Sequence, residues 1–125
     1  MNTKQEIILV GGGGHCKSVI DVIESTGLFL IAGIIDLPEK LGTNILGYKV
    51  IGTDDMLEEL SKKYSNFCIT LGQIKSSASR KKIFSKLTDL NVHLPVLISS
   101  TAHVSKHTKI GRGTVIMHGA TVNAG

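Results

Sequence analysis

The stretch IILVGGGGHCKSVID, residues 7–21, decides the fold of this chain. A short run of aliphatic residues precedes four glycines, which is typical of a buried strand that ends in a tight loop. After the loop, Val19, Ile20 and Ile23 recur at helical spacing, and Gly27 marks the end of the expected helix. A strand, a glycine loop and a helix N-terminus in this order predict an anion-binding site.

The next eighty residues repeat this alternation. We expect strands at residues 6–10, 29–36, 48–52, 66–72 and 93–99, helices at 15–26, 54–64 and 76–90, and a turn-rich connector at 37–47. Thr53 is expected to cap the second helix, and Ile83, Phe84 and Leu87 form the apolar face of the third. Pro95 places the last strand at a sheet edge. The alternation predicts an α/β fold, a Rossmann-like domain with a parallel sheet and right-handed βαβ crossovers.

A different period governs the chain after Ser99. Aliphatic residues recur every sixth position, and a small residue stands two positions before each of the last four. The aliphatic series is Ile98, Val104, Ile110, Ile116 and Val122, and the small series is Ala102, Thr108, Thr114 and Ala120. Because a helix has a period near 3.6 and a strand a period of 2, this pattern predicts a hexapeptide-repeat β-helix.

We therefore expect two domains, a βαβ domain at residues 1–98 and an incomplete β-helix at 99–125. Three hexads make one triangular coil in the left-handed form of this fold, so the second region holds little more than one coil. Solenoid repeats need their neighbours to bury an apolar face. The expectation is thus that the chain stops inside its second domain.

Composition narrows the classes of function. Hydrophobic residues make up 42% of the 125 and charged residues 19%, as in globular proteins. The net charge is +4, but the basic run at 80–82 reads as a solvated helix face, and no aromatic residues alternate with it, so no nucleic acid is expected. Cys16 and Cys68 fit neither a disulfide framework nor a metal-ligand spacing, which favours reduced thiols in a cytoplasmic protein. Since no signal peptide or transmembrane-length run occurs, no membrane partner is expected.

Candidate ligand contacts gather where the expected strands end, which is where open parallel sheets bind ligands. Cations at the start of a helix oppose its dipole, so the basic pair there suggests contact with an anion such as a diphosphate. An acidic residue after the second strand could hydrogen-bond a ribose hydroxyl. The candidate residues are Gly11, Gly12, Gly13, Gly14, His15, Lys17, Asp36 and Gly72.

Plainer explanations stay open for each of them. The glycines could form only a tight turn, His15 and Lys17 could point to solvent, and Asp36 could be a turn residue before Pro38. Cys16 could be an activated thiol at a helix N-terminus or simply a packed one. The dinucleotide fingerprint is broken because cysteine or lysine stands where its third glycine is needed, and a P-loop lacks its G-K-[ST].

The hexads contain His103, His107 and His118, and a histidine can serve as a general base. None stands in a readable relation to a nucleophile or carboxylate, and positions four apart on a β-helix do not share a face. Ser99 and Ser100 look like a linker between the two domains. The sequence therefore predicts neither a catalytic residue nor a metal site in this chain.

Four segments taken together resemble one known family. They are IILVGGGGHCKSVID, IAGIIDLPEKLG with LGYKVIGTDD, ITLGQIKSSASRKKIF, and LISSTAHVSKHTKIGRGTVIMHGATVNAG. In this order they are similar to bacterial nucleotide-sugar acetyltransferases of the PglD/NeuD type, which act on bacillosamine and sialic-acid-type sugars. The resemblance covers nearly the whole chain.

This resemblance implies a nucleotide-sugar-binding βαβ domain followed by a left-handed parallel β-helix. It implies acetyl transfer from acetyl-CoA to an amine or hydroxyl of the sugar, in a homotrimer that holds acetyl-CoA between neighbouring β-helices. The family's catalytic histidine belongs to a later coil, in an E-H-D or similar context, so it is expected beyond Gly125. The residues that match the pocket for a UDP-sugar or related substrate are Gly13, His15, Lys17, Asp36 and Gly72.

Two interpretations follow. The chain is either the substrate-binding part of an acetyltransferase, or a non-catalytic nucleotide-sugar-binding module with a short β-helical stub. A nicotinamide-dependent domain is disfavoured by the broken fingerprint and by the hexads.

Overall fold

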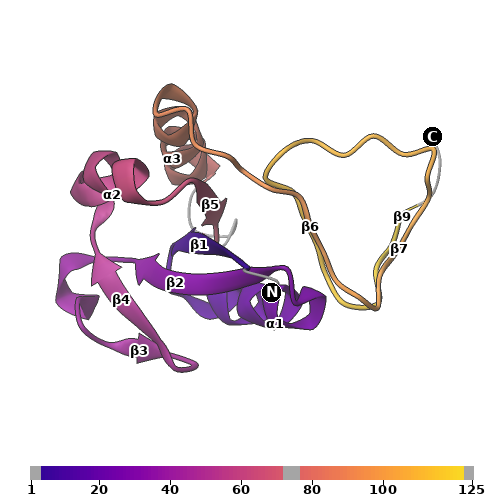
Figure 1. Ribbon diagram of the computed structural model, residues 1–125, viewed down its shortest axis with the longest axis horizontal. Helices are drawn as coiled ribbons and strands as arrows, with labels where there is room; N and C mark the ends of the chain where they lie inside the picture. The colour runs from indigo at the N-terminus through magenta and orange to yellow at the C-terminus, as the bar shows by residue number, and fades with distance from the viewer. Residues whose placement is uncertain (1–3, 72–76, 123–125) are drawn as a thin grey trace.

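The computed structural model describes residues 4–71 and 77–122, so Gly72 lies outside the described residues. A five-stranded sheet has the strand order β3-β4-β2-β1-β5 (Figure 1). Its strands are β1 (Gln5–Val10), β2 (Phe29–Ile35), β3 (Asn44–Ile45), β4 (Tyr48–Gly52) and β5 (Asn66–Ile69). The helices are α1 (Gly14–Thr26), α2 (Leu57–Lys63) and α3 (Ser77–Asp89), with short 3₁₀ turns at Pro38–Lys40 and Asp54–Met56.

The inner strand β1 is buried on both of its faces from Ile7 to Val10. It pairs in parallel with β2 on one side and with β5 on the other. Ile7 and Leu9 belong to the core under α1, whereas Ile8 and Val10 belong to the core under α2 and α3. The sheet therefore lies between two helical layers, which confirms the predicted α/β class and explains why residues 7–10 are continuously apolar.

Helix α1 matches its prediction closely. Val19, Ile20 and Ile23 are buried, and the helix ends at Gly27, whose φ of 68° is left-handed. The predicted cap of the second helix is wrong in detail. Thr53 begins the 3₁₀ turn, but its hydroxyl donates to the Asp55 carboxylate instead of capping the main chain. A strong acceptor two residues away thus competes with the cap.

The sheet is not purely parallel, which corrects the expectation. Part of the predicted connector forms β3, which pairs antiparallel with β4 through a two-residue turn at Leu46 and Gly47. Both turn residues have positive φ, 50° and 90°. Two-residue hairpins favour this geometry because its twist matches the strands, but leucine is a poor residue for it. The turn was hard to recognise for that reason.

Replacing Leu46 with asparagine should stabilise the protein. A non-glycine residue in the left-handed region costs roughly 1–2 kcal/mol, asparagine tolerates it, and the Leu46 side chain is 56% exposed. We expect the free energy of unfolding in urea to rise by about 1 kcal/mol. The matched control is Leu41→Asn, an equally exposed leucine with φ of −54°, which should change stability by less than about 0.5 kcal/mol. Equal effects of the two changes would contradict the strain argument.

The segment at 93–99 leaves the sheet, so its assignment as the last strand is wrong. Only His93 lies beside β5, where it forms an isolated bridge with Asn66. Leu97 then donates its N–H to the Thr114 carbonyl at 2.9 Å and pairs with Val115, outside the five-stranded sheet. The apolar run is explained by this second set of partners, because sequence alone does not say which strand an apolar run joins.

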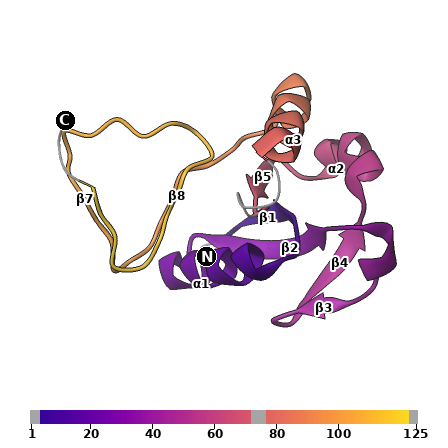
Figure 2. The same ribbon diagram turned by 180° about the vertical axis from the view of Figure 1, so that it is seen from behind.

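From Leu97 the chain forms a coil of triangular outline, seen from both sides in Figures 1 and 2. Strand β6 (Leu97–Ile98) pairs in parallel with β8 (Val115–Ile116), and β7 (His103–Val104) pairs in parallel with β9 (Thr121–Val122). Each residue thus pairs with the residue 18 positions later. The aliphatic residues of the six-residue pattern are half-buried, or exposed in the case of Ile98, because little more than one turn is described.

The coil packs against the end of the sheet domain. Leu97 is 2% exposed and belongs to the core under α1, and Val115 and Met117 pack on the same cluster. Ser100 also donates its N–H to the Ser25 hydroxyl at the end of α1. The coil is therefore held to the domain by α1. No helix within the described parts of the chain is long and apolar enough to cross a membrane.

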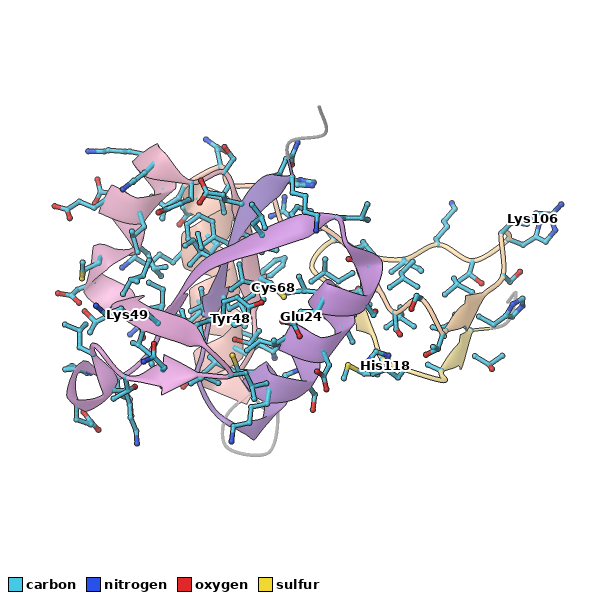
Figure 3. All side chains as sticks on the ribbon, turned by 60° about the horizontal axis from the view of Figure 1, so that its bottom comes forward. Glu24, Tyr48, Lys49, Cys68, Lys106 and His118 are labelled. Carbon is cyan, nitrogen blue, oxygen red and sulfur yellow. The ribbon has the colours of Figure 1, made fainter. Side chains whose placement is uncertain are left out.

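A polar contact joins α1 to strand β4 of the sheet. Tyr48 of β4 donates its hydroxyl to the Glu24 carboxylate at 2.6 Å, and the two side chains meet in Figure 3. This bond raises the pKa of Tyr48 above its ordinary value. It ties β4, the strand next to the edge strand β3, to the helix that begins at the glycine loop.

Candidate functional site

The order of the strands places a crevice beside β1. The chain moves from β1 outward to β2 and β4, and then returns to β5 on the opposite side of β1. Connections that leave neighbouring strands in opposite directions open a gap beyond the carboxyl ends of those strands. The glycine loop follows β1 at this point, so the predicted loop lies at the ligand-binding position of the fold.

The loop is fixed to both neighbouring strands. Gly11 donates its N–H to the Ile35 carbonyl at 2.8 Å, and the buried Thr70 hydroxyl donates to the Gly11 carbonyl. Gly11 has φ of 121°, and a Cβ atom there would meet Leu71 at 2.9 Å. Gly13 and Gly14 are exposed, and nothing lies within 4 Å of a Cβ built on either. The loop is thus rigid at its start and open at the helix N-terminus.

Asp36 lies directly against the loop. A Cβ atom on Gly12 would stand 2.2 Å from the Asp36 Oδ2 atom, so only glycine leaves room for this carboxylate. The other oxygen, Oδ1, accepts the N–H of Leu37 at 2.8 Å. Asp36 therefore serves the local turn with one oxygen and faces the loop with the other, so the two explanations left open by the sequence are compatible.

A cavity of about 560 Å³ opens on the other side of the loop, between the sheet domain and the coil. Its lining includes His15 from α1, Ile69 from the end of β5, Arg80 from α3 and Arg112 from the coil. None of the described lining residues is acidic. The cavity therefore combines positive charge with a helix N-terminus, which suits an anionic ligand.

His15 lies partly buried in this cavity. Burial, and then the charge of Arg80, lower the pKa of His15 below its ordinary value. The sequence predicted a cation opposing the helix dipole, but the neutral ring is favoured while no anion is close. Lys17 is exposed on α1 and is not among the lining residues of this cavity, so its assignment to the site stays a prediction.

Arg80 was missed in the sequence, where it reads as part of a solvated basic run. Lys81 and Lys82 are exposed, as that interpretation requires, but Arg80 is half-buried and donates to the Ile69 carbonyl at 3.3 Å. The sequence carries no signal that separates Arg80 from Lys81 and Lys82, because the burial of Arg80 depends on which face of α3 packs toward β5.

The assignment of Phe84 to the buried apolar face of the helix was also wrong. Phe84 is 37% exposed and lines the cavity with Arg112 stacked over its ring, while Ile83 is buried in the core.

Cys16 is a packed thiol. Its side chain is fully buried, and burial raises the pKa of Cys16 despite its place near the helix N-terminus. A raised pKa leaves little thiolate, so the residue is not an activated nucleophile. The plainer explanation of Cys16 is therefore the correct one.

The coil brings together two residues that the sequence treated separately. Residues 18 positions apart pair on adjacent layers, so the Ser99 hydroxyl lies close to residues 117 and 118 and meets Nδ1 of His118, with Thr101 beside them. Ser99 is only 2% exposed, so its hydroxyl cannot approach a substrate carbonyl. The pair links two layers of the coil. Within the described residues, no cluster of three His, Cys, Asp or Glu side chains that could hold a metal occurs.

A larger hollow, of about 650 Å³, lies at the opposite end of the sheet, where β1 and β5 begin. Its lining includes Gln5, Glu6, Asn66 and His93, at or before the amino ends of β1 and β5. Ligands of parallel sheets bind at the carboxyl ends instead, where the helix N-terminus is. The cavity beside His15 is therefore the candidate site although it is the smaller of the two.

Comparison with known proteins gives consistent results. The family model of the PglD N-terminal domain matches residues 6–87. The chain is 29% identical to a histidine-to-asparagine variant of perosamine N-acetyltransferase from Caulobacter crescentus, solved with CoA and GDP-perosamine, with a TM-score of 0.85. It is 31% identical to the acetyltransferase domain of PglB from Neisseria gonorrhoeae, solved with acetyl coenzyme A, with a TM-score of 0.82.

Both matches cover 98% of this chain, but only 56% and 58% of the two solved chains. The chain thus spans a little over half the length of these structures. UDP-D-quinovosamine 4-dehydrogenase from Vibrio fischeri shares the fold alone, at 22% identity over 73% of this chain and 75% of that chain, with a TM-score of 0.59. No curated protein matches the sequence.

Proposed function

Because the chain belongs to the PglD N-terminal domain family, we propose that it binds a nucleotide-linked sugar and that the full-length protein acetylates this sugar with acetyl-CoA. The observation that carries the proposal is the arrangement of groups beyond the carboxyl ends of the parallel strands. There a helix N-terminus lies between a carboxylate at Gly12 and a cavity with positive charge. These are the groups that the ribose and the diphosphate of a sugar nucleotide require.

The proposed roles follow from position. The main chain of Gly11, Gly12, Gly13 and Gly14 approaches the diphosphate, and His15 lies beside it. Asp36 accepts a hydrogen bond from a ribose hydroxyl through Oδ2, the oxygen that faces the loop. Lys17 and Gly72 are proposed as ligand contacts only because they match the family's nucleotide-sugar pocket.

The acetyl transfer itself belongs to the full-length protein. We expect the sugar amine or hydroxyl to attack the thioester carbonyl while a base takes its proton; the C–S bond then breaks and CoA leaves as its thiol, which takes up a proton. None of the described residues is assigned to acetyl-CoA or to this base. The 18-residue offset in the coil equals three hexads, which supports a left-handed parallel β-helix. A homotrimer, a UDP-linked substrate and a cytoplasmic location stay parts of the proposal.

The binding proposal is tested by calorimetric titration of this chain with UDP-linked and GDP-linked amino sugars, and with NADH for comparison. We expect micromolar to millimolar affinity for at least one sugar nucleotide and a weaker response to NADH. Both nucleotides are included because one similar structure contains GDP-perosamine, whereas the family resemblance implied UDP. Tight binding of NADH with no response to either sugar nucleotide would contradict the proposal.

The affinity for a sugar nucleotide should rise as the pH falls from 8 to 6. The pKa of His15 is lowered in the free protein, and a diphosphate beside it should raise this pKa, so binding takes up a proton. Arg80 of α3 and Arg112 of the coil line the same cavity as His15, and both are kept when only His15 is replaced.

UDP-N-acetylglucosamine is the suitable probe for this pH series, because its diphosphate has no terminal phosphate that titrates near neutrality. The slope of affinity against pH should be absent in His15→Gln. An unchanged slope in that variant would exclude His15 as its source.

A further inference from the structure

Arg80 occupies a position that its basic neighbours do not share. Its Nη1 atom donates to the Ile69 carbonyl, which holds the guanidinium at the carboxyl end of β5, at the rim of the cavity. An arginine has five N–H donors in a rigid fork, so one bond to the main chain leaves donors for a ligand. Lys81 and Lys82 of the same helix are exposed and are not part of the described lining.

The surroundings of Arg80 favour an anion. His15 lines the same cavity, and Arg112 of the coil is held against α3 by the Phe84 ring at 5.4 Å and by a 2.7 Å bond from its Nη2 to the Thr88 hydroxyl. No acidic residue of the described lining balances the charges of Arg80 and Arg112, so an anion in the cavity would lower their mutual repulsion. The feature is therefore a cavity with two built-in cations and not a helix N-terminus alone.

The charge of a diphosphate exceeds what the helix provides. The N-terminus of a helix is equivalent to roughly half a positive charge, whereas the diphosphate diester of a sugar nucleotide carries about two negative charges. A cation near the second phosphate would offset the charge that the helix leaves unbalanced. Arg80 of α3 lines the same cavity as His15 of α1 and is placed to do this.

Resting on the proposed function, we propose that Arg80 is the residue that makes this site select nucleoside diphosphates over monophosphates. Its fork binds the phosphate farther from the nucleoside, while the glycine loop and α1 bind the nearer one. Arg112 closes the same cavity from the coil, so the first turn of the coil is part of the nucleotide site.

The test compares UDP with UMP, or GDP with GMP if the guanine series binds better, on the intact chain at pH 8. Wild-type protein should bind the diphosphate about tenfold or more tightly than the monophosphate, as charge-assisted bonds to a phosphate predict. Arg80→Gln should lose most of this preference and keep its affinity for the monophosphate within about twofold. Arg80→Lys, which keeps the charge without the fork, should be intermediate.

Lys82→Gln is the matched control, because it removes one charge from the same helix outside the cavity lining. It should leave the preference within about twofold of wild type. Equal preferences in Arg80→Gln and Lys82→Gln would overturn the role of Arg80 while leaving sugar-nucleotide binding intact. No binding of any nucleotide by folded wild-type protein would instead overturn the proposed function. Thermal unfolding of each variant establishes that it is folded.

Discussion

Replacing Gly12 with alanine should remove most of the affinity for a sugar nucleotide. The new Cβ atom would stand 2.2 Å from Asp36 Oδ2 and 2.8 Å from the Ile45 Cδ1 atom, so the carboxylate has to leave its position beside the loop. Loss of a charged hydrogen bond to ribose alone corresponds to about 1.5–3 kcal/mol, or roughly 10- to 150-fold in affinity. Calorimetry with the sugar nucleotide measures this loss.

A double-mutant cycle separates this cause from a general loss of folding. Overpacking should cost Gly12→Ala about 1–3 kcal/mol of stability. In the Asp36→Ala background the same change should cost much less, because the clashing carboxylate is gone. Gly14→Ala, with nothing within 4 Å of its Cβ, should leave stability unchanged or slightly higher. Additive costs of the two changes would show that Gly12 and Asp36 do not meet.

Leu97→Ala should produce the second large effect. Leu97 is 2% exposed in the core under α1, and it pairs with Val115, which lines the cavity. Removing a buried leucine side chain costs about 2–5 kcal/mol, a large part of the 5–15 kcal/mol typical of a domain. Since the coil is held to α1 by this contact, sugar-nucleotide affinity should fall as well.

The neighbouring residue is the control for Leu97. Ile98 belongs to the same short strand, but it is 36% exposed, so Ile98→Ala should cost less than about 1.5 kcal/mol. Denaturant unfolding of the two variants measures the difference. If Ile98→Ala costs as much as Leu97→Ala, the coil is not anchored through Leu97.

The parts of the fold that were predicted correctly depend on local patterns. The strand, glycine loop and helix at residues 7–21 carry their own periodicity and their own stop signal at Gly27. The 18-residue pairing in the coil equals three of the six-residue periods, whereas the β-helix itself stays a prediction. In these regions neighbouring residues contain most of the information, so a single sequence suffices.

The errors arise where the partner lies elsewhere in the chain. The run that contains Leu97 is apolar for contact with α1 and the coil, and nothing in its pattern distinguishes this from a sixth sheet strand. The hairpin at Leu46 escaped notice because a leucine occupies a position that usually requires glycine or asparagine. Both are cases in which tertiary contacts override local preference.

The candidate site divides in the same way. The loop and Asp36 could be predicted because strand ends are visible in the sequence and parallel sheets bind ligands there. Arg80 could not be predicted, because its role depends on which side of α3 faces the carboxyl end of β5 and the cavity. Arg112 depends on the path of the coil, which brings a residue from the second half of the chain to the first.

The central claim is that a sugar nucleotide binds beyond the carboxyl ends of the parallel strands. A titration of isotope-labelled protein with a UDP- or GDP-linked amino sugar, followed by amide chemical shifts, tests both binding and location. We predict that the largest shifts occur at Gly11–His15, Asp36 and Arg80. Largest shifts at the opposite end of the sheet, around Glu6, Asn66 and His93, or no shifts at millimolar ligand, would contradict it.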